Sequence, residues 1–400
     1  MKRILYLIGP YDRYNYGDIL FPILITKELV THFDSIEILS TTKSDLTKIG
    51  GFKTEDFKGL NRLKSNNKNT LVVAGGESLF VNWGILASYL IKQFRHLNVI
   101  FVIIRRIFGY SAKYRLQNFI GRILLGGKTY IPLAVGKHEI KNLNYLVYNS
   151  LGGTALNNDL LKKFPKIIRN YNSVDYLAVR DKKTNLVLKK NNIKSLLVPD
   201  IAILISKHFN NTFLKSKISN QVKNENITNK SYIFFQISKS IGNDKIDIIA
   251  DQLRIIHEKT GKEIVLCPIG IALGHDNHLV LTKLSNQLEF NHLIFDENVN
   301  IWDIMYLISN SCLYIGTSLH GVITSMSYGI PYVGLEILKV KAYIETWGVK
   351  EMSKISNVNN FTNDAIKALE LNSYDQLRKS FEMQKQIVED FLDKTIRTLK

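Results

Sequence analysis

Short apolar runs alternate with longer mixed segments along most of the chain, and this alternation limits the fold more than any other feature of the sequence. The strands expected in the first half are Ile4–Ile8, Ile36–Leu39, Thr70–Ala74, Tyr176–Val179 and one of Val99–Ile104 or Tyr130–Val135. Between the first two strands, Asp18–His32 has apolar residues at roughly helical spacing. Strands that alternate with helices predict parallel β-α-β units with right-handed crossovers.

A second alternating set follows a change in composition. Residues 206–230 are rich in Asn, Lys and Ser and poor in apolar side chains, which is typical of a linker. The strands expected after it are Tyr232–Gln236, Glu263–Pro268, Leu293–Phe295, Cys312–Ile315 and Tyr332–Leu335. The helices expected between them are Ile246–Thr260, His278–Leu288 and Ile301–Ser309.

The pattern therefore predicts an α/β protein with two Rossmann-like domains that face a cleft. A chain of 400 residues is too long for one comfortable core, which also favours two domains. We expect an N-terminal domain at 1–205, a linker at 206–230, a C-terminal domain at 231–360 and a polar helical tail at 361–400. Ligands of such sheets bind outside the carboxyl ends of the strands, so residues that directly follow a strand are the candidate site residues.

Cysteine usage and the apolar segments favour a cytoplasmic protein. Cys267 and Cys312 lie in apolar stretches and are expected to be buried thiols in a reducing compartment. The apolar run in Met1–Pro10 is short and no small-residue cleavage site follows, so we interpret it as a strand rather than a signal peptide. Residues 71–91 are long and apolar, but Gly75-Gly76-Glu77 interrupts them early, which disfavours a membrane helix.

The net charge of +18 is unevenly distributed. No Asp or Glu occurs from Ser78 to His138, and apolar residues lie between the basic ones. The basic residues there are Lys92, Arg95, Arg105, Arg106, Lys113, Arg115, Arg122, Lys128 and Lys137. Such a stretch suits an anionic membrane surface through residues 92–128, with an ordinary solvated basic face as the alternative. A nucleic-acid partner is not expected, because no recognition motif accompanies the basic residues.

The sharpest local signal is the segment Cys312–Gly329. An apolar strand ends at Gly316, and Thr317 and Ser318 can then bond free backbone N–H groups or a ligand oxygen. A helix begins near His320, so free N–H groups and the positive end of the helix dipole would suit a phosphate or carboxylate. His320 can donate a proton or pair with an anion there. The alternative is a capped helix in which the histidine is merely packed.

Weaker motifs follow other predicted strands. They are Asn15-Tyr16-Gly17-Asp18, Gly75-Gly76-Glu77-Ser78, Val179-Arg180-Asp181, Pro199-Asp200 and Pro268-Ile269-Gly270 with His275-Asp276. Gly17 permits a tight turn, Asp18 can cap the next helix, and Arg180 offers a planar fork for carboxylate or phosphate. A helix cap, a turn and an ion pair would also explain these residues without any ligand.

Several well-known motifs are missing. The chain has no Walker A sequence, no His-Glu-X-X-His, no Cys pair at zinc spacing and no Gly-X-Ser-X-Gly. The first strand does not lead into Gly-X-Gly-X-X-Gly. We therefore expect neither a metal ion nor a dinucleotide cofactor.

Taken in order, the motifs that are present resemble those of the polysaccharide pyruvyl transferase family, from Asn15 to about Gly348. They are Asn-X-Gly-Asp at 15–18, Gly-Gly-Glu at 75–77, Val-Arg-Asp at 179–181 with Val-Pro-Asp at 198–200, and Leu-His-Gly at 319–321 with Tyr-Gly-Ile-Pro at 328–331. The resemblance implies a GT-B-like pair of domains. It also implies transfer of pyruvate from phosphoenolpyruvate to sugar hydroxyls as a ketal, on bacterial surface polysaccharides or their lipid-linked precursors.

The resemblance further implies roles for individual residues. His320 would be the acid or base, Arg180 an anion clamp, and Asp18 would orient an acceptor hydroxyl. The residues expected to bind substrate are Asn15, Gly17, Gly75, Gly76, Glu77, Asp181, Gly270, Asp276, Gly316, Thr317, Ser318, Leu319 and Gly321.

Ser318 departs from the family pattern, which commonly has an arginine at this place. Serine can donate a hydrogen bond but carries no charge. Another basic residue would have to replace the arginine, and the candidates are Lys239, Lys339 and Lys341. If none does, the donor differs, and the alternative function is a GT-B-type glycosyltransferase that uses a nucleotide sugar. A non-catalytic sugar-binding protein of the same fold is a third reading.

Overall fold

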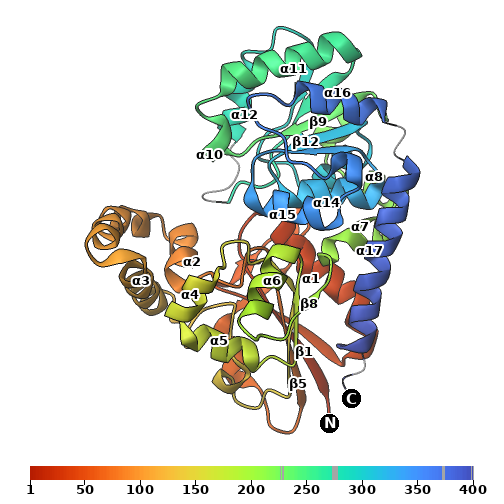
Figure 1. Cartoon of the computed structure of the whole chain (residues 1–400). Coiled ribbons are helices and arrows are strands. Elements are labelled where there is room, and N and C mark those ends of the chain that lie inside the picture. Colours follow the sequence, from red (N-terminus) through yellow and green to blue (C-terminus); the bar gives the residue numbers. More distant parts are fainter. Residues whose placement is uncertain (226, 228, 273–277, 372–373, 398, 400) are drawn as a thin grey trace.

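The computed structural model describes residues 1–225, 227, 229–272, 278–371, 374–397 and 399, and it contains two β-sheets, one above the other in Figure 1. In the described residues the N-terminal sheet has the strand order β3-β4-β2-β1-β5-β6-β7-β8, and the C-terminal sheet has the order β11-β10-β9-β12-β13. All pairings are parallel except that of β3 with β4. The predicted α/β class with two Rossmann-like domains is therefore confirmed.

The bounds of the elements are as follows. The N-terminal strands are β1 Arg3–Ile8, β2 Ser35–Ser40, β3 Ser44–Asp45, β4 Lys53–Asp56, β5 Lys68–Ala74, β6 Tyr145–Leu151, β7 Tyr176–Val179 and β8 Leu196–Leu197. The C-terminal strands are β9 Tyr232–Gln236, β10 Glu263–Leu266, β11 His292–Ile294, β12 Leu313–Gly316 and β13 Tyr332–Gly334. The helices up to the end of the first sheet are α1 Tyr16–Leu29, α2 Trp83–Leu90, α3 Asn98–Leu124, α4 Asn158–Lys163, α5 Pro165–Asn172 and α6 Lys182–Lys190. The later helices are α7 Ile205–His208, α8 Asn211–Lys217, α9 Asn220–Asn224, α10 Lys239–Gly242, α11 Ile246–Thr260, α12 His278–Ser285, α13 Ile301–Ser309, α14 Leu319–Tyr328, α15 Leu338–Trp347, α16 Thr362–Glu370 and α17 Tyr374–Lys394.

One strand of the first sheet lies elsewhere than the sequence predicted. Val99–Ile104 belongs to α3, and Tyr130–Val135 forms no strand. The strand between β5 and β7 is Tyr145–Leu151, whose residues after Tyr145 are all buried. The error has a physical reason: a short run of β-branched residues suits a strand and a helix equally when only its composition is considered. Ile131 and Leu133 instead pack beside the sheet, in the same apolar cluster as Tyr148 of β6.

The two domains share one continuous core. Nearly every side chain of α1 is buried, because this helix packs among elements of both domains. The predicted linker region contains α8 and α9, and Leu214, Ile218 and Val222 of this region are buried in the shared core. The backbone N–H of Ser219 also donates to the carboxylate of Asp303 at 2.7 Å. Residues 206–224 thus lie largely in short helices, of which α8 packs against α13 of the C-terminal domain.

The chain ends beside its own beginning. In Figure 1, α17 runs from the C-terminal domain down along α1, and the two termini lie close together. The guanidinium of Arg3 donates to the backbone carbonyl of Leu399 at 2.8 Å, and that of Arg397 donates to Glu28 at 2.5 Å. The predicted helical tail therefore includes a helix that spans both domains.

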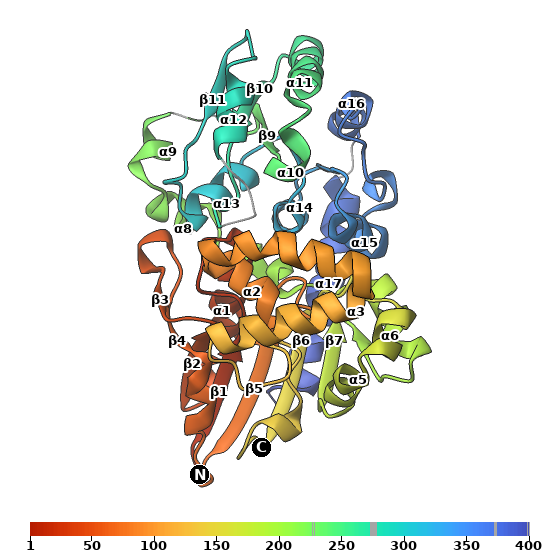
Figure 2. The same cartoon turned by 90° about the vertical axis from the view of Figure 1, so that its left-hand side faces the viewer.

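Helix α3 stands apart from this compact body. Gly109 adopts φ 80° and ψ 177°, which breaks α3 into two arms. The arms protrude at the left of Figure 1 and lie across the face that is turned to the viewer in Figure 2, with α2 packed against them. Among the helices described, none combines the length and the apolar character that crossing a bilayer requires.

Candidate active site

A cavity of about 390 Å³ lies between the domains, where the carboxyl ends of several strands from both sheets meet. It is lined by Pro10, Arg13, Asn15 and Asp18 after β1, by Gly76, Glu77 and Ser78 after β5, by Arg180 after β7, by Ser238 and Ser240 after β9, by Ile269 after β10, by Thr317, Ser318 and His320 after β12, and by Ile337 and Lys339 after β13. Helix α2 contributes Ile85, Leu86 and Tyr89, with Val81 just before it and Leu133 from a later loop. The structure thus brings the separate motifs of the sequence to one place.

The motif after β1 forms the beginning of α1. The Asn15 side chain caps this helix by accepting from the backbone N–H groups of Gly17 at 3.1 Å and Asp18 at 3.4 Å. Asp18 lies in the first turn and is buried at the cavity wall. Burial raises the pKa of the Asp18 carboxyl, although the charges of Arg13 and His320 oppose this rise. A carboxylate with a raised pKa is a better proton acceptor than an ordinary surface aspartate.

Gly17 and His320 are in direct contact across the domain boundary. A Cβ atom on Gly17 would lie 1.8 Å from Nδ1 of His320 and 2.3 Å from its Cε1. On another side the ring meets Phe21 edge-on, with the ring centroids 5.5 Å apart. The glycine of the first motif is therefore required by the histidine of the last, which the linear sequence does not reveal.

Arg180 forms a buried ion-pair network instead of pointing freely into the cavity. Its guanidinium donates to Glu77 and to Asp200, both at 2.8 Å. Glu77 in turn accepts from the backbone N–H and the hydroxyl of Thr154, each at 2.8 Å. Burial alone would lower the pKa of Arg180, but the two carboxylates outweigh it and leave the pKa raised. The network therefore holds a permanent charge that keeps both carboxylates ionised.

Asp200 connects this network to His320. Its Oδ2 atom, which accepts from Arg180, lies 3.6 Å from Nε2 of His320, within ion-pair distance. Burial raises the pKa of Asp200, but His320 and Arg180 outweigh this effect and lower it. In the part of the chain that the structure describes, Nε2 of His320 has no hydrogen-bond partner although it is buried. A proton on the imidazole would thus be balanced by a neighbouring carboxylate.

The beginning of α14 faces the same cavity. Ser318 is the N-cap residue, and its hydroxyl accepts from the backbone N–H of Gly321 at 3.4 Å. Thr317 is held by Gln236, whose side-chain oxygen accepts from the Thr317 N–H at 3.0 Å, and the Thr317 hydroxyl accepts from the N–H of Ser238 at 2.9 Å. Both hydroxyls therefore fix the turn, and the positive end of the helix dipole is directed at the cavity.

Arg13 is a site residue that sequence reasoning missed. Its side chain is 10% exposed, and its Nε and Nη1 atoms are buried with no hydrogen-bond partner among the described residues. The guanidinium carbon lies 5.2 Å from the ring centroid of Tyr89, and Nη1 is 3.6 Å from Asp12. Buried guanidinium nitrogens without hydrogen-bond partners are costly unless a ligand satisfies them, so Arg13 is a candidate anion-binding residue.

Three lysines were candidates to replace the arginine that the family commonly has at the position of Ser318, and one of them lines the cavity. Lys339 lines it and lies close enough to Asp18 to lower the pKa of that carboxyl. Lys341 instead lies 3.9 Å from Glu345, one turn further along α15. Lys239 is not among the residues that line the cavity.

The remaining predicted residues have structural positions nearby. Asp181 caps α6 by accepting from the N–H of Thr184 at 2.8 Å, and Gly270 pairs with Asn15 in an isolated bridge. Gly75, at φ 156°, packs against Pro10. Gly316 and Gly321 leave room for the hydroxyl of Tyr314. Leu319 is buried in the shared core. Asp276 lies outside the described residues.

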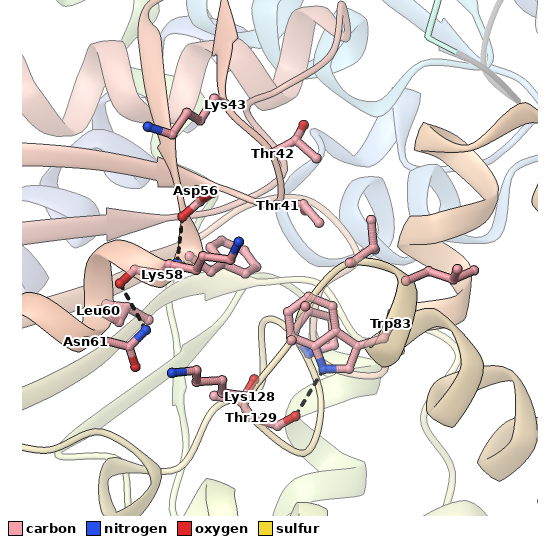
Figure 3. Close-up of a pocket in the computed structure, with 16 residues that line it drawn as sticks. Thr41, Thr42, Lys43, Asp56, Lys58, Leu60, Asn61, Trp83, Lys128 and Thr129 are labelled. Atoms are coloured by element: carbon pink, nitrogen blue, oxygen red, sulfur yellow. Dashed lines mark hydrogen bonds between the residues drawn. The ribbon is translucent and has the colours of Figure 1, made fainter.

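A second cavity, of about 230 Å³, lies beside Trp83 of α2 (Figure 3). It is lined by residues after β2 and β4 and by the end of α3, and the predicted site residues are not among them. No group of three or more His, Cys, Asp or Glu in the described ranges is placed to hold a metal ion.

The facing Rossmann-like domains, with a cavity at the carboxyl ends of both sheets, define a protein of the GT-B-like fold class. By sequence, the family model of the polysaccharide pyruvyl transferases matches residues 15–337, so the chain belongs to this family of transferases, which act in polysaccharide biosynthesis. No curated protein matches the chain significantly in sequence.

Solved structures with a similar fold include sugar-nucleotide enzymes. The UDP-GlcNAc 2-epimerase of Methanocaldococcus jannaschii, in complex with UDP-GlcNAc and UDP, is 12% identical over 92% of this chain and 92% of its own, with a TM-score of 0.51. The UDP-GlcNAc 2-epimerase of Neisseria meningitidis bound to UDP-GlcNAc is 13% identical over 98% and 99%, with a TM-score of 0.52. The S. aureus MnaA–UDP structure is 11% identical over 99% and 96%, with a TM-score of 0.53. At such identities the likeness shows the fold alone.

Proposed function

We propose that this protein transfers the pyruvyl group of phosphoenolpyruvate to two hydroxyl groups of a sugar and forms a cyclic ketal. The observation that carries the proposal is the meeting in one interdomain cavity of His320, Asp18 and Arg13, whose buried Nε and Nη1 atoms have no hydrogen-bond partner among the described residues. Family membership supports a glycan as the acceptor. No resident cofactor is needed, because phosphoenolpyruvate carries its own leaving group.

The reaction can be written with these residues. His320 donates a proton to the methylene carbon of phosphoenolpyruvate, which becomes a methyl group and leaves an oxocarbenium-like centre at the neighbouring carbon. A sugar hydroxyl adds to that carbon and gives its proton to Asp18. The carbon–phosphate oxygen bond then breaks, inorganic phosphate leaves, and a second hydroxyl adds and loses its proton, so that the ketal closes. Asp18 passes the first hydroxyl proton to the departing phosphate, and the proton of the second hydroxyl replaces the one lost from His320.

The cations and the helix end would hold the donor. Phosphoenolpyruvate carries a phosphate and a carboxylate, and the cavity offers Arg13, Lys339 and the positive end of α14 for them. Arg180 is a positioning residue in this scheme, because its guanidinium is already bound by Glu77 and Asp200. Lys339 supplies a positive charge in place of the arginine that is absent at Ser318.

A direct test measures phosphate release from phosphoenolpyruvate with and without candidate glycan acceptors. We expect acceptor-dependent release, and a loss of about 100-fold or more in His320→Ala, since general acid–base groups contribute on that order. Arg13→Gln should raise the KM for phosphoenolpyruvate strongly, whereas Arg62→Gln, which changes an exposed arginine with a side chain 68% accessible, should leave it unchanged. An enzyme that ignores phosphoenolpyruvate would contradict the proposal.

Ser318 supports a second candidate, a glycosyltransferase with a nucleotide-sugar donor. The end of α14 could hold a diphosphate without an arginine, and similar solved structures contain UDP or UDP-GlcNAc. The two candidates differ in their donor, so the same acceptors are incubated with nucleotide sugars in parallel. Consumption of a nucleotide sugar without use of phosphoenolpyruvate would favour the second candidate.

We further infer that the protein works in the cytoplasm, at the inner face of the cell membrane, on a lipid-linked glycan. A lipid-linked acceptor is confined to the bilayer, so an enzyme that modifies it must reach the membrane surface. The basic stretch without acidic residues from Ser78 to His138 supports this location. Fractionation of cells into soluble and membrane fractions, before and after a high-salt wash, tests it.

A further inference from the structure

The arms of α3 expose large apolar side chains to solvent. Phe108 is 69% exposed, Val99 68% and Ile107 66%, and Ile123 and Phe119 on the second arm are more than half exposed. Scattered exposed apolar residues are normal, but a contiguous group on one protruding element marks an interaction surface. We call these two arms, residues 98–124, the α3 hairpin.

Positive charge is interleaved with the apolar side chains of the α3 hairpin. Arg105, Arg106 and Arg115 are exposed, and Lys113 and Arg122 are half-buried. Within the described part of the chain, no carboxylate lies within ion-pair distance of these residues. This surface is therefore complementary to one that is anionic and apolar together, which is the character of the headgroup region of an acidic bilayer.

The backbone of the hairpin suits a position parallel to such a surface. Gly109 has φ 80°, and no atom lies within 4 Å of where its Cβ would be, so the break between the arms is in open space. Both arms lie on the same face of the molecule (Figure 2). Two short arms side by side, each with exposed apolar and basic side chains, can lie in the interfacial plane, whereas their charges prevent insertion across the hydrocarbon core.

The hairpin is joined rigidly to the active-site wall. Gly121 of α3 packs so closely on α2 that a Cβ there would lie 2.3 Å from the backbone nitrogen of Gly84. On the other side, Ile85 and Tyr89 of α2 line the interdomain cavity. A bilayer bound to the hairpin would therefore lie one helix away from the cavity, where a lipid-linked acceptor is needed.

We propose that the α3 hairpin binds the surface of a bilayer that contains anionic phospholipids, with Ile107, Phe108 and their neighbours inserted among the headgroups and the arginines paired with lipid phosphates. The second cavity extends this surface, because Leu124 at the end of the second arm and Lys128, shortly after it, line the cavity together with Lys58 (Figure 3). The inference deepens the proposed membrane location and rests on it, but it does not depend on the donor substrate.

The test is sedimentation of the full-length protein with vesicles of phosphatidylcholine alone and with vesicles that also contain phosphatidylglycerol. We expect binding to the anionic vesicles that weakens as salt is raised. Arg105→Gln with Arg106→Gln should reduce the partition coefficient by about fivefold for each charge removed. Ile107→Ser with Phe108→Ser should abolish binding that persists at high salt.

The matched controls are Leu186→Ser, an apolar side chain 56% exposed on α6, and Arg254→Gln, an exposed arginine on α11. Both should bind vesicles as the wild type does. Equal binding to neutral and anionic vesicles, or unchanged binding of both hairpin variants, would overturn the proposal. So would a concentration-dependent dimer that Phe108→Ser converts to a monomer, because a second copy would then cover the surface. The assay contains neither phosphoenolpyruvate nor glycan, so its failure is distinguishable from failure of the pyruvyl transfer.

Discussion

Replacing Gly17 by alanine is expected to damage the site through one specific contact. Gly17 lies within the first turn of α1, and alanine in a helix is ordinarily favoured over glycine by about 1 kcal/mol. Here the new Cβ would lie 1.8 Å from Nδ1 of His320, whereas non-bonded heavy atoms prefer about 3.5 Å. The ring or the helix must therefore move by more than about 1 Å.

Two consequences follow from this displacement. Overpacking of a well-filled region costs about 1–3 kcal/mol, which outweighs the helix preference, so the variant should be less stable than the wild type. A misplacement of about 1 Å at a catalytic group costs on the order of 100-fold in rate. Thermal unfolding and phosphate release from phosphoenolpyruvate measure the two effects separately.

A double-mutant cycle with His320→Ala identifies the contact. In the His320→Ala background the clash is absent, so Gly17→Ala should no longer destabilise the protein and should recover the helix preference. Gly76→Ala is the matched control, because its Cβ would meet Asp18 at 3.6 Å, an ordinary contact. If Gly17→Ala is equally destabilising with and without the imidazole, the reasoning is wrong.

The other predictions concern charge. Asp18→Asn should raise the melting temperature at neutral pH, because burial raises the folded-state pKa of Asp18 and its ionised form is unfavourable in the folded protein. This gain in melting temperature should shrink as pH falls through the raised pKa. The same variant should lose about 100-fold or more in turnover. Glu77 has a folded-state pKa below its unfolded value, despite burial, because of Arg180. Its contribution to stability is therefore present above about pH 4.5 and lost as pH falls through the folded pKa, so melting temperatures of Glu77→Gln should depend less steeply on acid pH than those of the wild type. Lys339→Ala should raise the KM for phosphoenolpyruvate about tenfold or more, as loss of a charged hydrogen bond would. Lys341→Ala, two residues further along the helix, should leave the KM unchanged. Equal effects of the two substitutions on KM would show that Lys339 does not bind the donor.

The sequence was a good guide wherever a side chain's role depends on its own neighbours in the chain. The helix start expected near His320 and the strand at Tyr232–Gln236 follow from local pattern, and both are found there. The cap of α1 was predicted at Asp18, but Asn15 supplies it and Asp18 lies in the first turn of the helix. The strand Tyr145–Leu151 was missed because two other apolar runs, Val99–Ile104 and Tyr130–Val135, compete with it in composition. Packing in the folded protein, rather than composition, determines which of the three runs forms the strand between β5 and β7.

Roles that depend on distant partners could not be predicted. Arg180 was expected to bind a ligand, but its partners Glu77 and Asp200 lie 103 and 20 residues away in the chain. Arg13 carries no motif, and only the burial of its Nε and Nη1 atoms, which have no hydrogen-bond partner in the described ranges, marks it. For the α3 hairpin, composition predicted the basic character, but the break at Gly109 and the exposure of Phe108 required the structure.

Glu28, at the end of α1, joins the two segments by which the chain passes between the domains. Burial raises the pKa of its carboxyl, but hydrogen bonds from His208 and Lys207 lower it to about 2. The same carboxylate pairs with Arg397 at 2.5 Å, so it binds both α7 and the segment that follows α17. The two crossings of the chain are thus fastened at one point, at the end of the helix whose side chains pack among elements of both domains. We expect this fastening to resist separation of the domains on that side, and loss of the Glu28 carboxylate to weaken it, because the cations around it would lose their partner.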